Sequence, residues 1–118
     1  MTDTHTPRGL AETYFLCWRR RDFTDLAPHL ADEVAFDGPL ASVRGREDCL
    51  EGLVGLARAT THLEVERRLV DENDVMTWFS LGVGGSEPTP VVNWCHVEDG
   101  RIRAIRVAFD PRGILAAG

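Results

Sequence analysis

The chain has 118 residues, a length that fits one domain, and we expect a single domain over residues 1–118. Its formal net charge of -6 argues against binding to nucleic acid. No stretch is long and apolar enough to span a membrane, and no secretory signal is visible, so we expect a cytoplasmic protein with no membrane partner. The chain contains no lysine, which excludes a lysine Schiff base and a P-loop.

The cysteines and histidines show no pattern that indicates a cofactor. Cys17, Cys49 and Cys95 are odd in number and form no C-x-x-C motif, which favours reduced thiols. The four histidines lack the spacing of a zinc motif. We therefore expect neither a metal ion nor another cofactor.

The N-terminal part of the chain predicts a helix. Thr6 followed by Pro7 is typical of a helix start, because threonine caps the first turn and proline has no N–H to leave unpaired. Arg19, Arg20 and Arg21 end this helix, where cations complement its C-terminus. The apolar stripe of the helix consists of Leu10, Tyr14, Cys17 and Trp18.

Two further helices are expected before the chain changes period. Asp22 can cap a short second helix that carries Phe23, Leu26 and Leu30, with Pro28 making its end irregular. Residues 46–59 predict a third helix, although its two glycines each cost about 1 kcal/mol relative to alanine.

Strands dominate the rest of the sequence. A polar turn at 71–74 and a loop at 84–90 separate three of them, and Asp99-Gly100 is a strong signal for a two-residue hairpin. Three helices and a meander of strands indicate an α+β fold with helices on one face of a curved, mostly antiparallel sheet. The expected strands are 34–37, 63–69, 75–83, 91–98 and 101–110.

Several segments, in this order, resemble the nuclear-transport-factor-2-like (NTF2-like) superfamily, which includes ketosteroid isomerases and SnoaL-like polyketide cyclases. The segments are 18–23, 30–39, 44–47 and 97–102. The resemblance covers about residues 11–110 and implies a cone-shaped fold. In that fold three N-terminal helices pack on the curved sheet and enclose an apolar cavity.

The same resemblance implies three catalytic side chains. Asp37 is similar to the general base of ketosteroid isomerases, and Tyr14 to the tyrosine that hydrogen-bonds the substrate oxygen. Asn93 stands where those enzymes carry a protonated aspartic acid, which is a departure from their pattern. Removing a proton next to a carbonyl needs such a base, and it needs donors for the enolate oxygen. The expected reaction is therefore isomerisation or cyclisation of a hydrophobic, steroid- or polyketide-like molecule.

Strand alternation separates the neighbours of Asn93 into two sets. If Asn93 points into the cavity, Trp94 must point to the other face. The residues expected to contact substrate are Trp18, Cys95, Val107 and Phe109. On the outer face the resemblance implies a homodimer, with contacts from Trp94, His96 and Arg106.

Other interpretations remain open for these residues. Asp37 before Gly-Pro also suits a turn, and Tyr14 also suits a helical core. The chain could instead be a non-catalytic module of the same fold that binds a small molecule or dimerises. A hydrolase similar to limonene-epoxide hydrolase is a further alternative, with Asp37, Arg103 and Asp110 as its only candidate residues.

Overall fold

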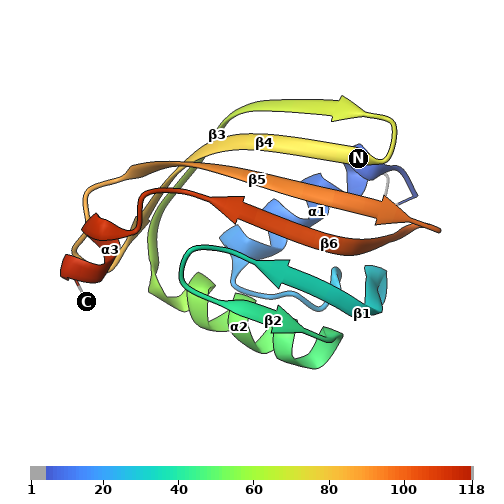
Figure 1. The fold of residues 1–118 in the computed structure, drawn as a ribbon, viewed down its shortest axis with the longest axis horizontal. Helices are drawn as coiled ribbons and strands as arrows, with labels where there is room; N and C mark the ends of the chain where they lie inside the picture. The colour runs from blue at the N-terminus through green and yellow to red at the C-terminus, as the bar shows by residue number, and fades with distance from the viewer. Residues whose placement is uncertain (1–4, 118) are drawn as a thin grey trace.

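A six-stranded sheet organises the molecule, in the order β2-β1-β6-β5-β4-β3. The structure, a computed structural model, describes residues 5–117. β1 and β6 run parallel and the other neighbouring strands run antiparallel. The sheet curves around α1, and no helix of the described residues covers its other side (Figure 1). Its strands are β1 (Leu30–Asp37), β2 (Ser42–Arg44), β3 (Thr60–Asp71), β4 (Asp74–Val83), β5 (Thr89–Glu98) and β6 (Arg101–Ala108).

Two of the three predicted helices cover the inner face of the sheet. α1 (Pro7–Arg20) begins after Thr6, whose side chain accepts a hydrogen bond from the Gly9 amide at 3.0 Å. α2 (Arg46–Ala59) has the predicted bounds, and its apolar side chains pack on β1 and α1. The α+β class and the mostly antiparallel, curved sheet are confirmed.

The expected second helix is wrong. Asp22 turns the chain instead, because its carboxylate accepts hydrogen bonds from both the amide and the hydroxyl of Thr24. Only a short 3₁₀ helix, η1 (Ala27–His29), follows, and Leu30 already belongs to β1. A short C-terminal helix, α3 (Arg112–Ala117), and the three-residue strand β2 were not expected.

The predicted phase of β5 is confirmed. Asn93 is 1% exposed, whereas Trp94 is 36% exposed on the opposite face. The Asp99-Gly100 turn has positive φ at both residues, which matches the twist that a two-residue hairpin requires. Val91, Cys95 and Val97 are buried with Asn93.

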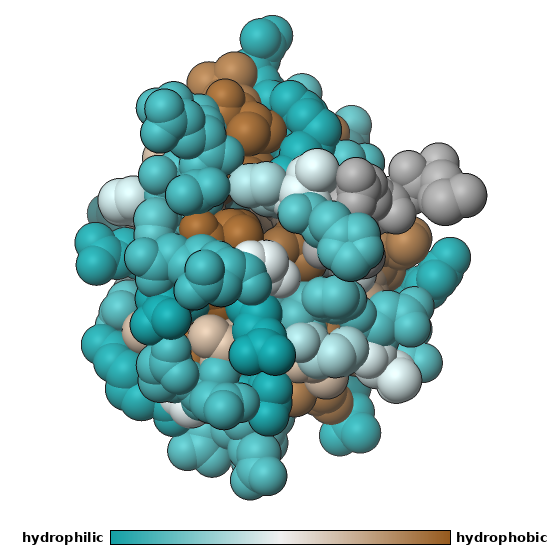
Figure 2. Space-filling model, turned by 90° about the vertical axis from the view of Figure 1, so that its right-hand side faces the viewer, coloured by the Kyte–Doolittle hydropathy of each residue, from teal (hydrophilic) through white to brown (hydrophobic). Residues whose placement is uncertain are grey.

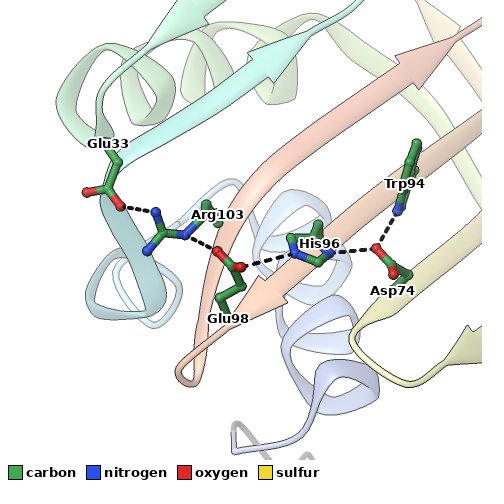
Figure 3. Close-up of polar contacts among 6 residues, drawn as sticks. All are labelled: Glu33, Asp74, Trp94, His96, Glu98 and Arg103. Carbon is green, nitrogen blue, oxygen red and sulfur yellow. Dashed lines mark hydrogen bonds and ion pairs between the residues drawn. The ribbon is translucent and has the colours of Figure 1, made fainter.

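The outer face of the sheet carries exposed apolar side chains beside a chain of polar contacts. Asp74 accepts a hydrogen bond from the Trp94 indole at 2.8 Å and lies 2.7 Å from Nδ1 of His96 (Figure 3). This contact raises the pKa of His96, and the two donors lower the pKa of Asp74. These polar contacts continue across the strands. His96 lies next to Glu98, and Arg103 forms ion pairs with both Glu98 and Glu33 (Figure 3).

The two ends of the molecule differ in character. Figure 2 looks onto the end where the β3–β4 and β5–β6 turns lie, and hydrophilic residues cover most of it. The opposite end holds the β1–β2 loop and α3 (Figure 1). No helix among the described residues is both long and apolar enough to cross a membrane.

Candidate functional site

An apolar cavity of about 230 Å³ lies between the inner face of the sheet and the helices, toward the end that holds α3. None of the described residues that line it is acidic, basic or a histidine. Among the described residues that line it, Tyr14 alone has a side-chain hydroxyl. The other lining residues are Trp18, Phe36, Gly38, Pro39, Leu40, Ala41, Val43, Cys49, Gly52, Leu53, Leu56, Phe79, Leu81, Val83, Val107, Phe109 and Ile114.

Aromatic rings form one wall of this cavity. Phe79 on β4 meets Phe15 edge-on, with 5.0 Å between ring centroids, and it meets Trp18 in the same way at 5.5 Å. The Trp18 indole N–H donates to the hydroxyl of Thr60 at 2.9 Å, so its polar edge is satisfied and its ring presents carbon to the cavity.

Tyr14 supplies a neutral hydroxyl. The residue is fully buried on α1, and Nδ2 of Asn93 donates to its oxygen at 3.4 Å. Burial raises the pKa of Tyr14 well above its usual value, with a further contribution from the thiols of Cys95 and Cys49. The hydroxyl therefore keeps its proton at physiological pH and can donate a hydrogen bond, whereas it cannot serve as an ionised base.

Asn93 and Cys95 face inward but do not line the cavity. They lie behind Tyr14 on β5, and the Cys95 thiol donates to Oδ1 of Asn93 at 3.2 Å. The expected direct contact of Asn93 and Cys95 with a ligand is therefore not what the geometry provides. Asn93 instead contacts Tyr14, which lines the cavity.

Asp37 does not join these residues, which corrects the expectation that all three polar groups converge. Phe36 and Gly38 line the cavity, so alternation turns Asp37 to the outer face, where it pairs with Arg106 in the strand register. Its carboxylate is 3.1 Å from Nη2 of Arg44 and is 37% exposed. A hydrogen bond from Ser42 lowers the pKa of Asp37, and the hydrogen bond and positive charge of Arg44 lower it further.

Three of the four expected contact residues line the cavity: Trp18, Val107 and Phe109. Segment 38–41 and several residues of α2 also line the cavity, although they were not expected there. A signal existed for α2, because Cys49, Leu53 and Leu56 recur at helical spacing. No comparable pattern marks Ile114 of α3.

The residues considered for epoxide hydrolysis do not meet. Arg103 pairs with Glu33 at 2.8 Å and with Glu98, while Asp110 pairs with Arg112 at 2.6 Å. Among the described residues no group of three histidine, cysteine or acidic side chains is placed to hold a metal ion. The cavity can thus enclose an apolar molecule, and the one hydroxyl among its described lining residues belongs to Tyr14. The Cys49 thiol, whose pKa burial raises to about 11, adds no charge.

Comparisons with known proteins agree with this architecture, which is that of NTF2-like proteins. An NTF2-like protein from Cytophaga hutchinsonii superposes with a TM-score of 0.84 at 22% identity, covering 98% of this chain and 99% of that one. A steroid delta-isomerase from Pseudomonas aeruginosa gives 0.82 at 23% identity, covering 95% and 85%. An LEH-like epoxide hydrolase from M. tuberculosis gives 0.74 at 20% identity, covering 92% and 85%.

The sequence itself identifies the family. The model of the SnoaL-like domain matches residues 11–105, and the chain belongs to this family. No curated protein matches the sequence.

Proposed function

We propose that the chain binds a small apolar molecule that carries a carbonyl or similar acceptor oxygen. The observation that carries this proposal is the cavity, whose lining is apolar except for the hydroxyl of Tyr14. Binding sites for small molecules commonly combine an apolar lining with a few placed polar groups. Because Asn93 donates to the oxygen of Tyr14, the hydroxyl proton is left to donate to the ligand.

Replacing Tyr14 with phenylalanine tests this proposal. The variant should bind 2-indanone about two- to tenfold more weakly, because one hydrogen bond contributes about 0.5–1.5 kcal/mol. It should bind indane, which has the same skeleton without the oxygen, as the wild type does. Titrations followed by protein NMR shifts measure both affinities. The proposal fails if neither probe binds the wild type, or if the ketone is insensitive to the hydroxyl.

A second candidate function is isomerase- or cyclase-type proton abstraction, with Asp37 as base and with Tyr14 and Asn93 as donors to the enolate oxygen. The likeness to a steroid delta-isomerase supports it. Asp37 also immediately precedes Gly38, which lines the cavity. To act as base, the carboxylate would have to leave Arg44 and turn around the end of β1.

Exchange of the α-protons of 2-indanone in deuterium oxide distinguishes the two candidate functions. Because the ionised Asp37 lies outside the cavity, we expect the wild type and the Asp37→Asn variant to bind the ketone equally and to exchange it at the buffer rate. Exchange above that rate in the wild type and its loss in Asp37→Asn would establish the enzymatic candidate instead.

We further propose that a second copy of the chain covers the outer face. Four large apolar side chains are exposed there, and the guanidinium of Arg106 lies 5.3 Å from the ring of Trp94. Exposed apolar patches of this kind mark association sites. The four side chains are Leu69, Met76, Trp78 and Trp94.

Sedimentation velocity tests this association. The wild type should sediment as a dimer and Trp94→Glu as a monomer, because a carboxylate in the middle of the patch would lose its hydration on association. Leu16→Glu, on the solvent side of α1, is the matched control and should remain a dimer. A monomeric wild type at high protein concentration would refute the proposal.

A further inference from the structure

We infer that Cys95 is a specificity-determining residue. Its thiol fixes the direction of the hydrogen bonds behind the cavity, so that Tyr14 donates to the ligand and the cavity selects a ketone over the corresponding alcohol. This inference rests on the proposed binding function and extends it to a residue that does not itself touch the ligand.

Two hydrogen bonds connect Cys95 to Tyr14 through the side-chain amide of Asn93. The Cys95 Sγ lies 3.2 Å from Oδ1 of Asn93, and Nδ2 of the same amide lies 3.4 Å from the hydroxyl oxygen of Tyr14. Cys95 and Asn93 are two residues apart on β5, so both side chains project from the same face, and each is 1% exposed. Once the amide oxygen accepts from the thiol, the amide nitrogen must face Tyr14.

The thiol is a constant donor. Burial raises the pKa of Cys95 to about 12, so it keeps its proton throughout the physiological range. A protonated thiol donates, whereas an alanine or valine side chain at this position would neither donate nor accept. Without that donor the amide can rotate by half a turn, and its oxygen can then accept the proton of Tyr14.

The direction of these two hydrogen bonds decides whether a ketone or an alcohol finds a hydrogen-bond partner in Tyr14. With Tyr14 donating, a carbonyl oxygen finds its partner and leaves nothing unpaired. An alcohol can also accept, but its own proton then meets an apolar lining, and an unpaired buried donor costs about 1–3 kcal/mol. With the amide reversed, Tyr14 presents lone pairs, and these suit the alcohol instead.

The test compares the affinities of 2-indanone and 2-indanol for the whole chain, measured by NMR titration. The wild type should prefer the ketone by about tenfold. Cys95→Ser keeps a donor and should keep the preference, whereas Cys95→Ala should lose or reverse it. Cys17→Ala removes another buried thiol, one that neither lines the cavity nor touches Asn93, and should keep the preference.

The possible outcomes separate this inference from the proposed function. If neither probe binds the wild type, the proposed function itself fails. If both bind and the ketone preference is the same in all four proteins, Cys95 has no such role, and the inference is overturned while the binding function stands. If Cys95→Ala does not fold, Cys95→Val fills the space without supplying a donor and should show the same loss of preference.

Discussion

Replacement of Gly52 by phenylalanine should abolish the binding of 2-indanone while leaving the fold intact. Gly52 lies on α2 and lines the cavity, and a Cβ added there meets no atom within 4 Å. The new ring can therefore enter the cavity, where burial of its apolar surface is favourable, and occupy the space of the ligand. Helix propensity should add a few tenths of a kcal/mol of stability, because glycine is the poorer helix former.

Gly55→Phe is the matched control for this experiment. Gly55 lies on the same helix with equally open space around its added Cβ, but it does not line the cavity. NMR titration with 2-indanone should show wild-type affinity for Gly55→Phe and no saturable binding for Gly52→Phe. Equal affinities in the two variants would mean that the ligand does not occupy this cavity.

Truncation of Phe79 to alanine should lower the free energy of unfolding by several kcal/mol, far more than truncation of an exposed side chain. Phe79 is fully buried and its ring packs against those of Phe15 and Trp18. Removing such a side chain costs about 3–5 kcal/mol, from lost burial and from the enlarged cavity. Urea unfolding followed by circular dichroism should show a lower midpoint with an unchanged slope.

Leu16→Ala provides the comparison for that measurement. Leu16 follows Phe15 on α1 but is 37% exposed, so its truncation leaves no cavity and should cost less than about 1 kcal/mol. If Phe79→Ala were no more destabilising than Leu16→Ala, the aromatic wall of the cavity would not be part of the core.

The sequence was informative where a repeated pattern spans several turns or residues. The apolar spacing in α1 and α2, with Thr6 as cap, predicts both helices, and period-two alternation in β5 places Asn93 inside and Trp94 outside. These signals are strong because each depends on many side chains that must share one buried face.

Asp37 was expected to face the cavity, but the inward–outward alternation of side chains along β1 places it on the outer face of the sheet. A one-residue step moves a side chain to the other face of a strand, and the residues that fix the phase of β1 are Val34 and Phe36, which point inward. Residue 38, rather than 37, therefore faces the cavity. The expectation for Asp37 was based on the similarity of Asp-Gly-Pro to the ketosteroid isomerase pattern and not on this alternation.

Other parts of the site could not be predicted because their position depends on tertiary packing. β2 has three residues and lies at the edge of the sheet, where it pairs with β1 and contacts α2. α3 has six residues, too few for a helical period to be evident, yet Ile114 closes part of the cavity. The contact between Asn93 and Tyr14 joins residues that are 79 positions apart, so no local pattern indicates it, and the family resemblance alone placed the two side chains together.

Intermolecular NOEs from 2-indanone to the methyl groups of the protein test most directly whether the cavity between the sheet and the helices is the binding site. We predict NOEs to Leu53 and Val107, which line the cavity, and none to Leu69 on the outer face. NOEs to Leu69 without any to Leu53 or Val107 would contradict the account, because the ligand would then be bound to the exposed side of the sheet.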